Sequence, residues 1–176
     1  MTDTSRAKSL SFSQAIALTQ SLMEQIEAGR LDETEIKRQV VSILKDKNGG
    51  RGFFVSYLTS DMTLADNPSQ GTLDGLKFSI ELVSELLVKN LAMSSAMIVT
   101  HNRNHDSDNA EGSLQVNRRT KNLFKQLNCP ENKEQLLQLQ RAIQTGNGEY
   151  QNFLQRWNYD AEQKKAIEEA IADVLA

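Results

Sequence analysis

The sequence predicts a mainly α fold, a single-domain helical bundle of about six helices with one possible short strand from Gly52 to Thr59. Three observations support this prediction. Apolar residues recur three and four positions apart along most of the chain, which is the pattern of amphipathic helices. Aromatic residues make up only 6% of the chain, and it has two prolines. β-Sandwiches and β-barrels usually contain more aromatic residues in their strands and more turn-forming residues such as proline. The length of 176 residues suits one domain, which we expect to span residues 1–176, with residues 1–12 disordered.

The first two predicted helices form an antiparallel pair. The first runs from Ser13 to Ala28 and is followed by Gly29, a residue typical of the position just past a helix end. The second opens at Asp32, with Glu35 three residues later, which is the spacing of a capping box. Because only a short turn separates the two helices, we expect them to pack against each other.

The segment GFFVSYLT follows a cluster of glycines and is the best strand candidate in the chain. An isolated strand leaves its backbone groups unpaired, so this segment must either pair with another strand or be helical instead. The preceding DKNGGRG differs from a phosphate-binding loop, which follows a strand, opens a helix and ends in Lys-Ser or Lys-Thr. We therefore expect a turn here.

A long central helix is predicted to begin near Thr72 or Asp74 and to contain the apolar stretch from Leu73 to Val99. From Leu86 onward its apolar residues cover almost the whole circumference, which is typical of a helix in the middle of a bundle. Charged residues interrupt the stretch and argue against a membrane span. They are Asp74, Lys77, Glu81, Glu85 and Lys89.

Three more helical segments complete the prediction. One runs from Ser113 to about Leu127. Pro130 suits the first turn of the next, whose apolar pattern spans Leu136 to Ile143. An aromatic-rich turn or two then leads to a last helix that opens at Asp160.

Composition narrows the classes of partner and compartment. The net charge of −3 gives no sign of a surface for nucleic acid, and we expect neither nucleic acid nor a membrane as partner. A single cysteine, Cys129, excludes an intrachain disulfide and a cysteine-based zinc cluster. The first residues lack the apolar core of a signal peptide, so a cytoplasmic location is expected. No cofactor signature is recognisable, and the cofactor stays unknown.

The segment ELLVKNLAMSSAM, from Glu85 to Met97, together with the upstream GRGFFVSYLT, resembles a family of uncharacterised cyanobacterial proteins of about this length. The resemblance covers roughly Gly50 to Leu127. Because that family carries no assigned function, the resemblance implies no site and no mechanism, and only a cyanobacterial origin.

The two histidines of the chain, His101 and His105, are candidate metal ligands. Four residues apart on a helix, their rings would lie on one face, and Asp106 or Asp108 would add an oxygen ligand. The pattern departs from known motifs, because no glutamate follows His101 and a third histidine is absent. The alternative is that the histidines lie at the end of the long helix, where cations interact favourably with the helix dipole.

Two surfaces are candidates for partner binding. A basic face carries Arg118, Arg119, Lys121 and Lys125, which would suit an acidic protein partner or, less well, phosphates. Such a face is also common on solvated helices. An aromatic group includes Trp157 and Tyr159, which would either anchor a partner or complete the core of a chain that is poor in aromatic residues.

The functional expectation is a non-catalytic protein-interaction or regulatory protein that binds a protein partner or associates with itself. It rests on the lack of concentrated histidine, cysteine or paired-acid motifs that most catalytic sites show. The alternative is a metal-dependent binding protein or enzyme that uses the cluster of His101 and His105. The two differ in what they require of these histidines.

Overall fold

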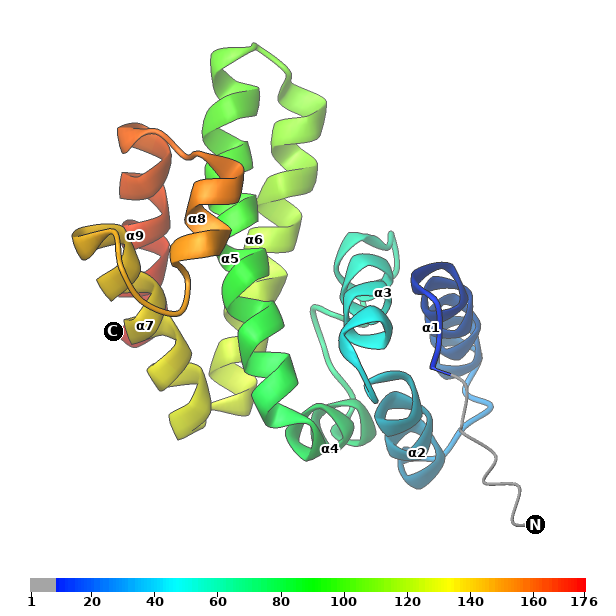
Figure 1. Cartoon of the computed structure of the whole chain (residues 1–176). Coiled ribbons are helices and arrows are strands. Elements are labelled where there is room, and N and C mark those ends of the chain that lie inside the picture. The colour runs from blue at the N-terminus through cyan, green and yellow to red at the C-terminus, as the bar shows by residue number, and fades with distance from the viewer. Residues whose placement is uncertain (1–8) are drawn as a thin grey trace.

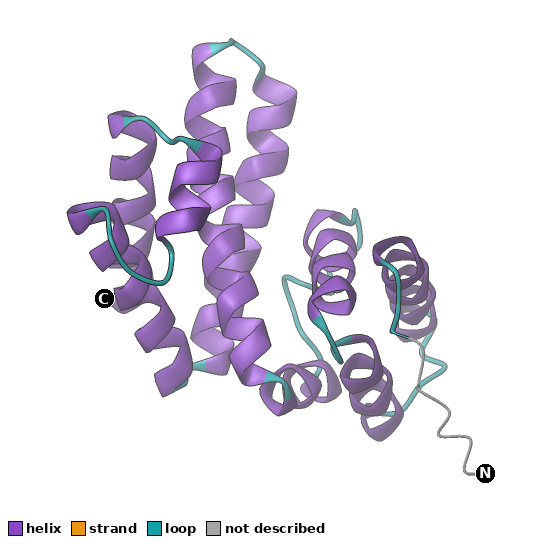
Figure 2. Cartoon of the chain, viewed as in Figure 1, coloured by secondary structure: helices purple, strands orange, loops and turns teal. Residues whose placement is uncertain are grey.

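The computed structural model describes residues 9–176, and in this part of the chain it contains nine helices and no strand (Figures 1 and 2). The mainly α prediction is confirmed, whereas the expected number of about six helices is too low. The predicted disorder of residues 1–12 falls mainly on residues 1–8, which lie outside the described residues. The helices are α1 (Phe12–Glu27), α2 (Glu33–Ile43), α3 (Lys47–Thr59), α4 (Gln70–Phe78), α5 (Ile80–Arg103), α6 (Ser107–Leu127), α7 (Pro130–Thr145), α8 (Gln151–Trp157) and α9 (Ala161–Leu175).

The possible strand from Gly52 to Thr59 is wrong, because this segment forms most of helix α3 (Figure 2). Asp46 caps the helix by accepting a hydrogen bond from the backbone N–H of Gly49. The buried apolar residues then lie at helical spacing, in the order Phe53, Phe54, Tyr57 and Leu58. The glycines that suggested a turn are inside the helix and let neighbouring helices approach closely.

Two helices begin at places that the sequence pattern did not indicate. The predicted central helix is two helices, α4 and α5, because the backbone at Ser79 departs from helical geometry, with φ −111° and ψ 36°. Helix α6 begins at Ser107 rather than Ser113, since Asp106 caps it. Helix α7 begins at Pro130, which confirms the expectation that this proline lies in the first turn, where its missing N–H has no cost.

The antiparallel hairpin of α5 and α6 lies at the centre of the molecule (Figure 1). Helices α7, α8 and α9 lie on one side of it, and α1 to α4 lie on the other. The expected pairing of α1 with α2 is the minor one, because α1 packs chiefly on α3 and α2 chiefly on α4. One cluster of buried apolar side chains extends through the described residues, from Ala15 in α1 to Ile171 in α9.

A buried polar contact fixes the register of the central hairpin. The side-chain amide of Asn117 in α6 donates hydrogen bonds to the hydroxyls of Ser94 and Ser95 in α5, at 3.0 and 2.9 Å. All three residues are buried. Because buried polar groups must be paired, a shift of α6 along α5 would leave them without partners.

Among the described residues, helix α5 (Ile80–Arg103) is long and apolar enough to cross a membrane by length and composition. Slightly more than half of its most apolar part, 56%, is buried inside the molecule. Core helices of globular proteins meet the same criterion, and α5 contacts α6, α7 and α9 along its length.

Candidate functional site

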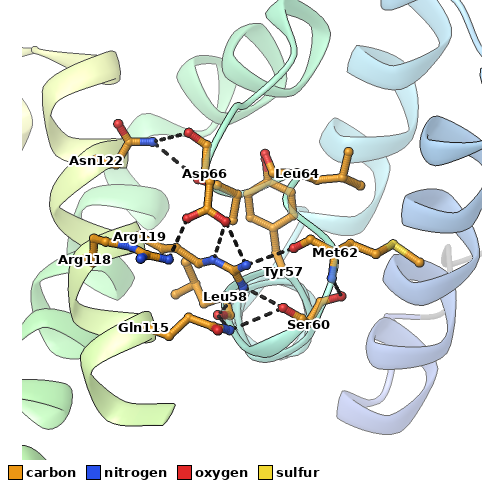
Figure 3. A network of polar contacts seen from close by, with 11 residues as sticks. Tyr57, Leu58, Ser60, Met62, Leu64, Asp66, Gln115, Arg118, Arg119 and Asn122 are labelled. Carbon is orange, nitrogen blue, oxygen red and sulfur yellow. Dashed lines mark hydrogen bonds and ion pairs between the residues drawn. The ribbon is translucent and has the colours of Figure 1, made fainter. Parts of the chain in front are cut away.

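Arg119, one of the predicted partner-binding residues, lies inside the molecule, with only 3% of its surface exposed. It reaches from α6 to the end of α3 and the loop that follows (Figure 3). Its guanidinium donates to the carbonyls of Leu58, Ser60 and Met62 at 2.7 to 3.0 Å, and twice to the Asp66 carboxylate at 2.8 and 3.1 Å. These bonds use all five N–H donors of the side chain.

The Arg119 network, formed by Arg119, Asp66 and the three carbonyls, ties α6 to the α3–α4 loop. The Arg119 guanidinium lowers the pKa of the Asp66 carboxyl, chiefly through its hydrogen bonds. Arg118 makes a further ion pair with Asp66 at 3.0 Å, and Tyr57 donates a hydrogen bond to the Leu64 carbonyl in the same loop (Figure 3). The geometry indicates a structural role for Arg119, which holds one wall of the groove described below.

The rest of the predicted basic face is partly neutralised within the chain. Lys121 pairs with Asp173 of α9 at 2.8 Å, and Arg118 pairs with Asp66. Lys125 is exposed in the last turn of α6. The four cations therefore do not form one free basic patch, because three of them have acidic partners inside the molecule.

The two aromatic candidates lie in different environments. Trp157, at the end of α8, is 47% exposed, and its ring lies beside the Arg156 guanidinium. Tyr159 is buried and packs edge-on against Phe153, and this burial raises its pKa to about 12. Only Trp157 is therefore available to an external partner.

The predicted metal ligands lie at the turn between α5 and α6. His101 is in the last turns of α5 and is half-buried, with its Nδ1 3.7 Å from a carboxylate oxygen of Asp106. His105 lies beyond the helix end in a left-handed conformation, with φ 55°, and is exposed. Asp106 and Asp108 belong to the start of α6, where Asp106 caps the helix.

Since α5 ends at Arg103, the two histidines do not share a helical face as their spacing suggested. Across residues 9–176, no three His, Cys, Asp or Glu side chains are arranged to hold a metal ion. Metal binding stays a prediction, with His101 and Asp106 as the pair that the structure brings together.

A groove of about 360 Å³ lies where α3 meets the α5–α6 hairpin. The hairpin extends beyond the end of α3, so that its outer part is uncovered on this side (Figure 1). The volume is within the range of small-molecule and peptide-anchor sites. The lining residues are Phe54, Val55, Leu58 and Thr59 of α3, Asn90, Met93, Ser94, Met97 and His101 of α5, and Asn109, Gly112, Ser113, Gln115 and Val116 of α6.

The lining of the groove combines apolar side chains with uncharged polar ones, and His101 is its one ionisable residue. Val55 and Met97 are apolar lining residues that are exposed to solvent, at 45% and 38%. Neutral amides surround them, from Asn90, Asn109 and Gln115. Apolar surface open to water is costly, and a neutral polar rim adds hydrogen-bonding groups without a desolvation penalty for charge. The groove can therefore bind an apolar, uncharged surface.

The Arg119 network holds one side of this groove. Arg119 and Gln115 both donate to the Leu58 and Ser60 carbonyls, and Leu58 and Gln115 are themselves lining residues. Removal of the network would release the end of α3 from α6 and open that wall.

Sequence reasoning did not find the groove. Met93 and Met97 recur at helical spacing in the most apolar part of α5, which is typical of core residues. The pattern around Val55 predicts a strand. Gly112 gave no signal either, because the predicted helix begins at Ser113 and leaves this glycine before it, whereas α6 contains it.

A second hollow, of about 350 Å³, lies along α7. Its lining residues, Pro130, Lys133, Glu134, Leu137, Gln138 and Arg141, all belong to that one helix. Because no second element forms an opposite wall, this hollow offers a poorer site than the groove.

Comparison with protein families gives one match. A model of the family described as Uncharacterised conserved protein UCP020893 matches residues 11–174, nearly the whole chain. The chain belongs to this family. The resemblance to an uncharacterised family is thereby confirmed over a longer range than the residues that suggested it, while the cyanobacterial origin stays a prediction. Searches among curated proteins and among solved structures found no match.

Proposed function

We propose that this protein is a non-catalytic interaction protein that binds a protein partner in the groove between α3, α5 and α6. The observation that carries the proposal is the exposure of Val55 and Met97 within a groove that three helices line. Exposed apolar side chains that line a concave surface are typical of binding sites.

The chemistry of the lining favours binding over catalysis. His101 is the one ionisable side chain of the lining, and its Nδ1 lies 3.7 Å from a carboxylate oxygen of Asp106. A catalytic site needs at least a nucleophile or an acid–base pair facing a common space. The groove instead combines apolar side chains with amide groups, which suits binding. We also propose that the protein is cytoplasmic and meets its protein partner there.

Site-specific photocrosslinking in the native host tests this proposal. A photoreactive amino acid would replace Met97 in the full chain, and a matched variant would carry it in place of Leu137. Leu137 is an apolar residue of similar exposure, 41% against 38%, and lies on α7 outside the groove. We expect a covalent adduct of defined mass with one protein from the Met97 variant and none from the Leu137 variant.

The adduct is then identified by mass spectrometry, and the two purified proteins are mixed to show that they bind directly. The absence of an adduct at Met97, or the same set of adducts at both positions, would contradict the proposed function.

A further inference from the structure

Gly112 differs from every other glycine of the chain. Three of the others, Gly29, Gly146 and Gly148, have positive φ, where glycine is the favoured residue. The remaining five lie against neighbouring atoms that a Cβ would strike at 1.8 to 2.6 Å. They are Gly49, Gly50, Gly52, Gly71 and Gly75. At Gly112, a Cβ would meet no described atom within 4 Å.

Gly112 therefore has no packing partner among the described residues, although it lies inside helix α6. Glycine is among the least favourable residues in a helix interior, so this position weakens α6 without a benefit inside the molecule. Gly112 is exposed and lines the groove between Asn109, Ser113 and Val116. Glycine would be favourable at this position if a binding partner packs directly on the α6 backbone. Small residues let packed helices come closer together.

The length of the groove suits a helix. Along α5 the lining residues run from Asn90 to His101, about three turns, or about 16 Å. Another side of the same part of α5 is already covered by a helix, because Gln163 of α9 donates to the Thr100 hydroxyl at 2.9 Å and Ile167 and Ile171 are buried. The outer part of the α5–α6 hairpin thus packs against a helix on one side and is open on the groove side (Figure 1).

Charge at the end of the groove adds a constraint. Asp108 lies one helical turn before Gly112, on the same face of α6, and is exposed. It has no ion-pair partner among the described residues, unlike Asp66 and Asp173 of the same region, which pair with α6 cations. A ligand that lies along the groove would meet His101 as the one ionisable lining side chain, and beside the groove, one turn from Gly112, it would meet the Asp108 carboxylate.

We propose that the occupant is an amphipathic helix of a partner protein, about three turns long. Its stripe of apolar residues packs on Met97 and Val55 and crosses α6 at Gly112, and a lysine or arginine at one end pairs with Asp108. The inference rests on the proposed function and adds the structure and chemistry of the partner. It predicts the helix-in-groove mode, in which apolar residues at spacings of three and four anchor the ligand.

A displayed library of amphipathic helical peptides tests the inference, with the purified full chain as bait. The library varies the apolar residues and places lysine or glutamate at either end. We expect enriched peptides that carry lysine at one end, and that bind Gly112→Ala and Met97→Lys at least about tenfold more weakly than the unsubstituted chain. Leu137→Lys is the matched control and should bind normally.

Gly112→Ala separates loss of the site from loss of the fold, because alanine favours the helix and meets no described atom. The weaker binding of this variant should therefore accompany a higher melting temperature. Asp108→Asn should reduce binding and its salt dependence only for peptides that end in lysine.

Equal binding by Gly112→Ala, or a library without a peptide that depends on the groove, would overturn the helical partner. The proposed function would then still be judged by the adduct at Met97, which requires no helix. If the adduct at Met97 is also absent, both proposals fail. An adduct at Met97 with an extended segment or a small molecule would refute the proposed helical partner.

Discussion

At the scale of single residues, Arg119 contributes most to the arrangement of the candidate site. Its charge is removed from water, and the desolvation cost is offset because each N–H finds an acceptor. An arginine at an exposed helix surface was the natural interpretation of the sequence, since basic side chains are seldom buried. Its burial depends on the path of the α3–α4 loop, which no local pattern encodes.

Asp66→Asn should destabilise the protein by about 2 kcal/mol, because it leaves the buried guanidinium of Arg119 without its counter-charge. The cost falls below that of a fully buried pair, since the Asp66 side chain is 26% exposed and the three carbonyls remain. Urea unfolding at neutral pH measures the change. Asp61→Asn is the matched control, because Asp61 lies exposed in the same loop, and equal loss in both variants would contradict the role of the ion pair.

The contribution of Asp66 to the unfolding free energy should depend on pH, and its lowered pKa sets the direction of the change. The pKa of Asp66 is lower in the folded chain than in the unfolded one, so its contribution is present above the unfolded pKa of about 4. This contribution is lost as the pH falls through the lowered pKa. The difference in unfolding free energy between the unsubstituted chain and Asp66→Asn should therefore shrink below about pH 4. A difference that stays constant with pH would exclude this linkage.

At the scale of helices, α3 shows why part of the fold escaped sequence reasoning. Its glycines suggested a turn, and its β-branched and aromatic residues suggested a strand. The helix forms because Asp46 caps it and because its small residues let two neighbouring helices pack closely. Gly50 faces Leu86 of α5, and Gly52 faces α1. These partners are distant in sequence, so the local propensity was misleading.

Gly52→Ala and Gly112→Ala should change stability in opposite directions. At Gly52, a Cβ would lie 2.5 Å from Ala15 Cβ and 3.0 Å from backbone atoms of α1, so α1 must move, at a cost of about 2 kcal/mol. At Gly112 the space is open, and the substitution should stabilise the chain by about 0.5 to 1 kcal/mol. Chemical denaturation measures the change in unfolding free energy for each variant. If both changes have the same sign, the packing explanation is wrong for one of the two glycines.

The sequence predicted those helices whose signals are local. The first helix and its glycine, the second helix with its cap at Asp32, and the last helix with its cap at Asp160 lie close to the predicted positions. The groove was not predictable in the same way, because its walls come from three helices that meet only in the folded chain. Of the predicted site residues, His101 alone lines it.

At the scale of the whole molecule, we propose that the described helices form one cooperative domain. The core cluster is continuous from α1 to α9, and the Arg119 network joins the N-terminal helices to the central hairpin. Unfolding in urea should therefore be a single transition with the same midpoint by Trp157 fluorescence, which reports on α8, and by far-UV circular dichroism, which reports on all helices. Separate midpoints would show that the two sides of the hairpin unfold independently.

The position of Arg119 along the chain also constrains how the protein is made. The carbonyls at the end of α3 accept hydrogen bonds from a side chain that the ribosome adds about sixty residues later. Until α6 emerges, these acceptors lack the Arg119 donors, and the loop is held only by contacts such as the hydrogen bond from Tyr57 to the Leu64 carbonyl. Translation therefore leaves the N-terminal helices incomplete, with one wall of the groove unset, and the end of α3 reaches its final state only after the central hairpin has been synthesised.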